Sequence, residues 1–291
     1  MKRKIVKFSL LTIIIISLIT PLIYSFTFFN GFAGQIKPTD YPPDWYEIND
    51  FLNEDKQDFK ILFLPWHQYM DFGWINNTNK RIANPAKYFF DKEVISGTNA
   101  EIGDVYREVN TPEQIYIDSL LDKRDDITDM GKLISILNIK YVILTKESDF
   151  KKYFFLLNQT DLELIKNTKN LFLFKNKNHV SKIYQTDDID NIGAQKVGLS
   201  YEQLNPVKYR LEDNRSKKYI VFTEPFSKDW KLGGKAPLQA YGVVNAFENS
   251  GKEVIFERFY RINLPAYVIS ILAFIGLILI YPGLEKRKNK L

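Results

Sequence analysis

The sequence predicts an α+β protein anchored in a membrane by two transmembrane helices, which flank an external α/β subdomain and a β-sandwich. Uncharged apolar segments lie close to both ends of the chain. Between them, helical and strand-like patterns alternate as far as about residue 180, and only short strand-like runs follow. The expected parts are a transmembrane helix with a cytoplasmic N-terminus (1–30), a linker (31–43), an α/β subdomain (44–180), a β-sandwich (181–262), a second transmembrane helix (263–282) and a basic cytoplasmic tail (283–291).

The second apolar segment, residues 264–281, contains no charged residue. Its length of about 18 residues corresponds to roughly 27 Å of helix, which is enough to cross a bilayer core with little tilt. A core helix of a soluble protein would show one polar face, and this segment shows none. We therefore expect a membrane span here.

The first apolar segment, residues 8–29, is also uncharged and follows a basic start. Those features fit a retained span or a cleaved signal peptide. The apolar run is longer than a usual signal core, and Phe32-Ala33-Gly34 is a poor cleavage site. Pro21 is acceptable in a transmembrane helix. We expect a retained span, with a cleaved signal as the alternative.

Basic residues outside both spans predict the topology. The first seven residues include Lys2, Arg3, Lys4 and Lys7, and the last six include Lys286, Arg287, Lys288 and Lys290. Such short basic tails are typical of cytoplasmic ends, so residues from about 31 to 262 are expected outside, at a two-pass cell membrane. These tails hold more positive charge than the net +5 of the whole chain, so the middle is net negative. We therefore expect no nucleic-acid partner.

The chain has no cysteine, which excludes disulfides, zinc–thiolate sites and thiol catalysis. The acidic run 187–191 lacks the glycine and further oxygen ligands of a calcium loop, so we interpret it as a polar turn. His67 and His179 have no carboxylate at a recognisable spacing, so we interpret both as surface or packed residues. We expect no metal and no cofactor.

The α/β elements are predicted from periodicity and capping. Asp44 is expected to cap a helix over 45–53, because apolar residues recur on one face of that segment. Thr111, Pro112 and Gln114 form a capping-box pattern for a helix to about residue 121. Further helices are expected at 128–137 and 148–157, and strands at 59–64, 140–145, 162–165 and 171–174.

The second half shows strand-like runs at 208–211, 219–222, 240–247 and 254–259, separated by Gly, Asn and Asp clusters. That spacing is typical of a β-sandwich. Because the last run leads almost directly into residue 264, we expect the sandwich to lie close to the bilayer.

Several short motifs resemble the C-terminal extracytoplasmic region of YfhO-like multi-spanning membrane proteins, which are related to GT-C lipid-linked glycosyltransferases. In the second half they are Asn205-Pro206-Val207-Lys208-Tyr209, Tyr219-Ile220-Val221-Phe222, Glu224-Pro225-Phe226, Asp229-Trp230 and 241–247 with Gly251. Upstream they are Tyr41-Pro42-Pro43-Asp44-Trp45, Leu64-Pro65 and 137–144. The resemblance covers roughly residues 36–282.

This chain departs from that family because only one predicted span precedes the external part. Family members usually carry a bundle of spans there, and the reactive carboxylate of a GT-C enzyme lies on an early loop of that bundle. The family's catalytic residues therefore have no counterpart in this sequence. The chain is a stand-alone module, a partner of a separately encoded bundle, or a truncated reading frame.

Two groups of residues are candidates for a site. The weak catalytic candidates are the acids that follow the first span, Asp40, Asp44 and Glu47. A carboxylate beside a lipid phosphate acts as a base or holds a cation. Helix capping and solvation are the alternative roles for these acids. Aromatic rings that could stack on sugars are Trp66, Tyr69, Trp74, Trp230 and Tyr241. A role in cores or at the membrane interface is the alternative for these rings.

These observations predict a membrane-anchored module that assists the assembly of a cell-surface glycan or lipid-linked sugar. Its expected partners are the lipid bilayer, a glycan or lipid-linked sugar, and a multi-spanning membrane subunit. We do not expect catalysis by this chain alone. The alternatives are a split part of a GT-C-type glycosyltransferase and a structural surface protein without a ligand.

Overall fold

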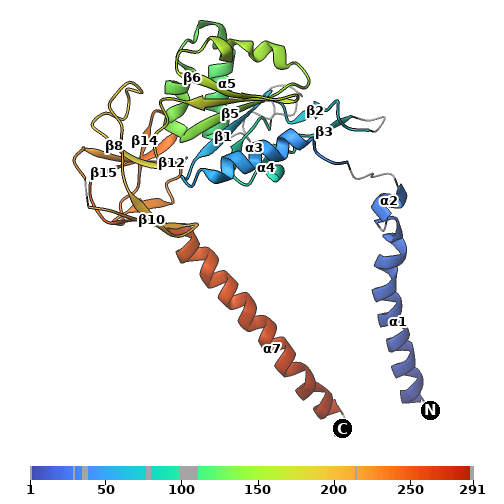
Figure 1. Cartoon of the computed structure of the whole chain (residues 1–291). Coiled ribbons are helices and arrows are strands. Elements are labelled where there is room, and N and C mark those ends of the chain that lie inside the picture. Colours follow the sequence, from blue (N-terminus) through green and yellow to red (C-terminus); the bar gives the residue numbers. More distant parts are fainter. Residues whose placement is uncertain are drawn as a thin grey trace.

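The computed structural model describes residues 2–28, 30–34, 39–76, 80–98, 111–213 and 215–288, and it shows an α+β protein. The body contains two five-stranded sheets, a four-stranded sheet and a two-stranded hairpin. Two long helices, α1 (Lys2–Tyr24) and α7 (Leu264–Lys288), project from the body on the same side (Figure 1).

The long helices differ in how much apolar length they show. Among the residues described in detail, one helix is long and apolar enough to cross a membrane, over Phe259–Gly276, and α1 carries a shorter apolar stretch, Leu11–Tyr24. The predicted anchoring by two helices therefore stays a prediction. A π-helical turn, η6 (Phe259–Asn263), joins the last strand to α7. After α1 come a short turn, η1 (Phe26–Phe28), and α2 (Asn30–Gly34).

The α/β unit is built on a sheet with the strand order β4-β1-β5-β7-β6. Strands β4, β1 and β5 run parallel, and β7 and β6 continue the sheet antiparallel. The central strands are buried on both faces, which explains their nearly continuous apolar sequence. The strands are β1 (Lys60–Leu64), β4 (Glu93–Ile95), β5 (Ile139–Thr145), β6 (Leu162–Asn167) and β7 (Leu171–Asn176).

Helix α3 (Pro43–Glu54) covers one face of this sheet. Trp45, Ile48 and Leu52 are fully buried on its inner side, as the periodicity predicted. The predicted N-cap is wrong, however: Pro42 holds that position and makes no side-chain cap. Asp44 lies inside the first turn because the two prolines begin the helix earlier than expected.

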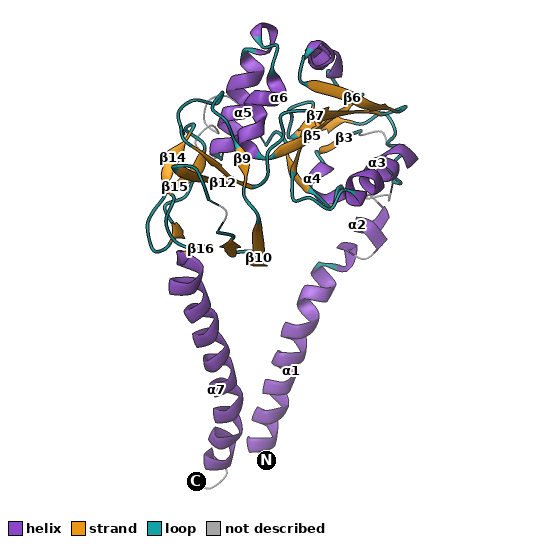
Figure 2. Ribbon diagram, turned by 60° about the vertical axis from the view of Figure 1, so that its left-hand side comes forward, coloured by secondary structure: helices purple, strands orange, loops and turns teal. Residues whose placement is uncertain are grey.

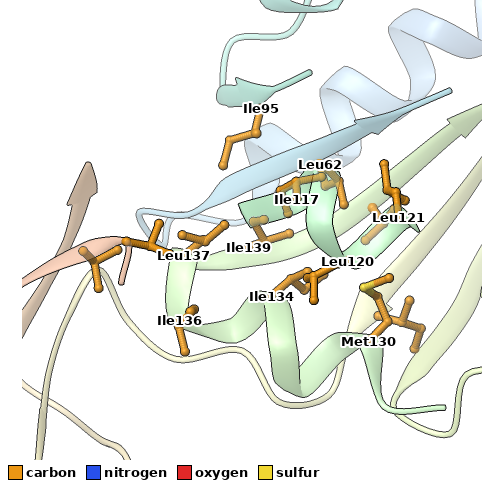
Figure 3. Packing of buried hydrophobic residues seen from close by; sticks show 14 of the residues in the cluster. Leu62, Ile95, Ile117, Leu120, Leu121, Met130, Ile134, Ile136, Leu137 and Ile139 are labelled. Atoms are coloured by element: carbon orange, nitrogen blue, oxygen red, sulfur yellow. The ribbon is translucent and has the colours of Figure 1, made fainter. Parts of the chain in front are cut away.

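Helices α5 (Pro112–Asp122) and α6 (Met130–Ile134), followed by η4 (Ser135–Leu137), cover the opposite face. The predicted capping box at Thr111 and Gln114 is confirmed, with both reciprocal hydrogen bonds formed. Figure 3 shows Ile117 of α5 beside Leu62 of β1, and Leu120 of α5 beside Ile134 of α6, in this core.

Smaller elements complete the unit. The predicted helix at 148–157 is instead the 3₁₀-helix η5 (Phe150–Asn158). A hairpin of β2 (Tyr69–Asp71) and β3 (Arg81–Ala83) and the short helix α4 (Ala86–Phe89) fill the aromatic region after β1. Another 3₁₀ turn, η3 (Arg124–Asp126), follows α5.

The second unit is a sandwich of two sheets, ordered β10-β11-β16-β13 and β14-β15-β12-β8-β9. Residues from both sheets meet in one apolar cluster that includes Tyr209, Phe222, Trp230, Phe247 and Val254. The strands are β8 (Ile183–Thr186), β9 (Val197–Gly198), β10 (Tyr201–Asn205), β11 (Lys208–Leu211), β12 (Tyr219–Pro225), β13 (Trp230–Leu232), β14 (Leu238–Ala240), β15 (Val244–Glu248) and β16 (Glu253–Phe256).

The single strand predicted at 240–247 is instead parts of two strands, because the chain turns within it. Strand β14 ends at Ala240 and β15 begins at Val244, and the two pair as an antiparallel hairpin. Tyr241 and Gly242 between them both have positive φ angles, of 52° and 75°, which a continuous strand cannot contain.

The two units share one core. The outer face of the β14–β9 sheet, with Val221 and Val244, packs into the same cluster as α5, α6 and β1. The four-stranded sheet is consequently the outermost layer, and in both views its strands β10 and β16 lie next to the start of α7 (Figures 1 and 2).

A group of charges centred on three buried side chains, Lys60, Glu113 and Lys182, lies where the units meet. We call it the inter-unit charge cluster: Lys60, Glu93, Glu113, Lys182, Glu224 and Asp58. The Lys60 side chain is 1% exposed, and its ammonium lies 2.6 Å from Glu113, 3.2 Å from Glu93 and 4.0 Å from Glu224. Lys182 bridges Glu224 at 3.0 Å and Asp58 at 3.2 Å. Burial alone would lower the pKa of Lys60, but the three carboxylates outweigh it and raise that pKa. The cluster therefore joins β1 of one unit to β12 of the other.

Candidate functional site

A hollow of about 690 Å³ opens on the outer face of the four-stranded sheet, beside the root of α7. We call it the sheet-face hollow. It is lined by Arg210, Leu211, Asp213, Lys231, Gly233, Gly234, Lys252, Glu253, Ile255, Glu257 and Tyr260. The lining combines three basic side chains, three carboxylates, a tyrosine and an apolar floor.

Strand alternation explains why these side chains point outward. In β11, β13 and β16 every second residue enters the sandwich core, so the residues between them face away from it. Arg210, Lys231, Glu253 and Ile255 occupy those outward positions. The register places Arg210 opposite Glu253 and Lys231 opposite Ile255, so the four side chains form one continuous patch.

Two of the carboxylates in the hollow are already neutralised by neighbouring cations. Glu253 accepts a hydrogen bond from Lys208 at 2.8 Å and lies 3.7 Å from the Arg210 guanidinium, and these contacts lower the pKa of Glu253. Asp213 lies 3.1 Å from Arg215 and 3.4 Å from Lys252. The hydrogen bond from Arg215, and after it the charge of Lys252, lowers the pKa of Asp213. Both acids are therefore ionised at neutral pH.

Lys231 and Glu257 differ from these pairs. Within the described parts of the chain, neither the Lys231 ammonium nor the Glu257 carboxylate has an ion pair or a side-chain hydrogen bond. Lys231 is nevertheless only partly exposed. Tyr260, on the first turn before α7, accepts a hydrogen bond from Asn205 at 3.1 Å, which fixes its ring at the edge of the hollow. The hollow therefore offers one donor cation and one acceptor anion that are not used inside the protein.

Two glycines shape the rim of the hollow. Gly233 and Gly251 have φ angles of +56° and +86°, and their backbones touch. A Cβ atom on Gly251 would lie 2.9 Å from the Cα and N of Gly233, closer than real Cβ atoms approach. This contact holds the turn after β13 against the turn before β16.

Two of the three carboxylates proposed from the sequence make contacts between elements of the α/β unit. Asp44 accepts hydrogen bonds from the Thr168 hydroxyl at 2.8 Å and from the Asn170 backbone and side chain at 2.8–3.2 Å. Burial opposes ionisation of Asp44, but these donors outweigh it and lower its pKa. Glu47 pairs with Lys166 at 2.7 Å, and Asp40 is exposed. Asp44 and Glu47 thus attach α3 to the β6–β7 hairpin.

The aromatic candidates do not form one platform. Trp66 and Trp230 are each 8% exposed, and they belong to different cores. Trp74 packs against Tyr41, Trp45 and Phe72 on the face of the α/β sheet that α3 covers. The Tyr241 hydroxyl lies 3.4 Å from the Asp188 carbonyl, and Tyr69 is 48% exposed. Buried rings offer no free face for a sugar, so the structural interpretation fits Trp66 and Trp230.

Both histidines pack against polar partners. His67 has a carboxylate partner that its spacing in the sequence did not reveal, because its Nε2 lies 2.9 Å from Asp149. The two residues follow the carboxyl ends of the neighbouring parallel strands β1 and β5, so the fold brings them together across 82 positions of sequence. His179 is packed, as predicted: its Nε2 lies 2.8 Å from the Asn138 amide oxygen. Burial, and after it Lys140, lowers the pKa of His179 to about 4.

Sequence reasoning missed the sheet-face hollow. The signal available was the charged residue at every second position of short apolar strands, as in Lys208-Tyr209-Arg210-Leu211 and Trp230-Lys231-Leu232. Which charged positions would share a face depends on strand pairing, and pairing is not visible in one sequence. Comparison of the chain with family models, curated proteins and solved structures returned no match.

Proposed function

We propose that this chain is a membrane-anchored, extracytoplasmic module that binds the headgroup of a lipid-linked sugar in the sheet-face hollow. In this proposal α1 and α7 are both membrane helices, and the chain itself performs no chemistry. The module assists glycan assembly by holding the headgroup at the membrane surface.

The topology is supported by charge and by the placement of the long helices. Basic residues cluster at the two ends of the chain, and the part between them is net negative. Helices α1 and α7 project from the same side of the body (Figure 2). With both ends cytoplasmic, the body stands on the outer surface of the membrane.

The observation that carries the proposal is the chemistry of the hollow at the root of α7. Phe259, where the apolar window begins, follows Glu257 of the lining by two residues. The hollow is therefore at headgroup height whenever α7 spans the bilayer. A glycosyl phosphate brings an anion for Lys231 and hydroxyl donors for Glu257. The paired charges around Glu253 and Asp213 can exchange hydrogen bonds with the remaining sugar hydroxyls.

The resemblance to YfhO-like proteins agrees with this ligand class, because that family is related to enzymes acting on lipid-linked sugars. The binding site proposed here does not depend on the family's catalytic loop. It uses only residues of this chain's own sandwich.

Native mass spectrometry of the full chain in mild detergent tests the proposal. The probes are a polyisoprenyl phosphate carrying one hexose, the same polyisoprenyl phosphate without sugar, and phosphatidylglycerol. We expect the glycosyl phosphate to bind most tightly. Because a charge-assisted hydrogen bond contributes about 1.5–3 kcal/mol, Lys231→Ala should weaken that binding at least about tenfold.

Lys228→Ala is the matched control, because Lys228 is exposed just before β13 and does not line the hollow. It should bind like the unmodified chain. Equal binding by the two variants, or equal retention of all three lipids, would contradict the proposal. Co-purification of a many-span protein with no bound lipid would favour the partner-binding hypothesis instead.

A further inference from the structure

The α/β unit carries an exposed aromatic patch of its own, far in sequence from α7. We define the α3–α4 aromatic patch as Tyr41, Tyr46, Tyr88 and Phe89. Tyr88 is 91% exposed and Tyr46 is 51% exposed. Contiguous exposed apolar patches mark interaction sites for other molecules or for membranes, whereas single exposed side chains do not.

The buried core supports three of the four rings of the patch, those of Tyr41, Tyr46 and Phe89. The Phe89 ring lies 4.4 Å from the Tyr41 ring, 5.2 Å from the Tyr46 ring and 5.2 Å from the Trp45 ring, measured between centroids. Trp45 itself is fully buried beneath the sheet. Tyr46 therefore extends a packed aromatic core outward and keeps its position without a ligand, and Tyr88, the residue before Phe89 on α4, is almost fully exposed.

The position of the patch selects its partner. In both views α3 and α4 lie on the side of the sheet toward which α1 and α7 project, whereas α5 and α6 lie on the other side (Figures 1 and 2). Tyr41 also follows the end of α2 at Gly34 by about seven residues, which limits their separation to roughly 25 Å even in a fully extended chain. A bilayer crossed by α1 and α7 would face this patch.

Tyrosine is enriched at the membrane–water interface, where its ring enters the headgroup layer and its hydroxyl stays hydrated. Lys87, exposed next to Tyr88, adds a group that interacts with lipid phosphates. Asp50 lies one turn beyond Tyr46 on the exposed side of α3, and this carboxylate limits how deeply that helix can enter.

We propose that the α3–α4 aromatic patch rests in the headgroup layer of the bilayer and forms a second, peripheral membrane contact in addition to the long helices. This contact prevents the body from tilting about the root of α7, so the sheet-face hollow stays at a fixed height and orientation. The inference rests on the proposed membrane anchoring. The contact is aromatic, so it should persist in a purely zwitterionic bilayer and at high salt.

Site-directed spin labelling tests this inference, and the absence of native cysteine makes single labelling clean. The full chain is reconstituted in phosphatidylcholine nanodiscs with a nitroxide at Lys87→Cys, which leaves all four aromatic residues in place. The control label is at Lys123→Cys, an exposed position at the end of α5 on the opposite sheet face. Power saturation measures the accessibility of each label to oxygen and to a water-soluble nickel chelate.

We expect the label at position 87 to be at least about threefold less accessible to nickel than the label at 123, and more accessible to oxygen. Adding Tyr46→Asp and Tyr88→Asp should restore its nickel accessibility. Equal nickel accessibility at 87 and 123 would overturn the inference. Loss of access to both reagents at 87 would also overturn it, because that pattern indicates cover by protein.

Reconstitution itself separates this inference from the proposed anchoring. If alkaline carbonate extracts the chain from the membrane, the anchoring is wrong and the inference fails with it. If the chain resists extraction but the label at 87 lies in water, the anchoring stands and only the second contact is refuted.

Discussion

Removing the Lys60 ammonium tests whether the inter-unit charge cluster holds the two units together. In Lys60→Met, Glu113 keeps its 8% exposure but loses the cation at 2.6 Å, and Glu224 is left with Lys182. Breaking a buried ion pair from one side costs about 3–5 kcal/mol. With a urea m-value of about 2–3 kcal/mol/M, the unfolding midpoint should fall by roughly 1–2.5 M.

The assay is urea unfolding of the full chain in mild detergent, followed by tryptophan fluorescence. All four tryptophans lie between residues 45 and 230, so the signal reports the body and not the long helices. Lys235→Met is the control, because the Lys235–Glu248 pair is 65% and 69% exposed and should contribute less than about 1 kcal/mol. If Lys60→Met lowers the midpoint no more than the control does, the cluster does not join the units. Adding Glu113→Leu to Lys60→Met should recover part of the loss, because it removes the stranded carboxylate.

Three further outcomes are expected. Between pH 6.5 and about 4 the unfolded chain binds a proton at His179 that the folded chain does not bind. The free energy of unfolding should therefore fall by up to about 3 kcal/mol as the pH is lowered through this range. His179→Gln should flatten that slope in urea titrations. Gly251→Ala should lower the thermal midpoint more than Gly234→Ala, because both have positive φ but only the first also meets Gly233; equal effects would contradict the rim contact. Asp44→Ala should destabilise the body by about 2 kcal/mol without changing binding of the glycosyl phosphate, and a selective loss of binding would restore Asp44 as a site residue.

The sequence predicted a helix or strand well where a single local residue pattern determines it. The capping box at Thr111 and Gln114 needs only side chains three residues apart, and it is confirmed. The apolar runs that became β1 and β5 are buried on both faces, so their continuous apolar character was a direct signal. At Asp44 a generic capping rule failed because two prolines shifted the helix start.

Contacts distant in sequence were not predictable in the same way. Nothing in one sequence places Asp149 beside His67, or Glu224 beside Lys60, because each pair depends on how strands order in a sheet. The hollow around Lys231 has the same origin, since its lining comes from three strands and the turn before α7. Five aromatic residues were visible as candidates, but one sequence does not show which rings are buried, such as Trp66, and which are exposed, such as Tyr69.

We propose that the headgroup of a lipid-linked sugar occupies the sheet-face hollow. Photo-crosslinking tests it most directly, with a diazirine on the sugar of a polyisoprenyl glycosyl phosphate and the full chain in nanodiscs. We expect the labelled peptides to come from residues 208–213 and 228–260. Labels confined to the α/β unit, or spread along α1 and α7 without enrichment in those peptides, would contradict it.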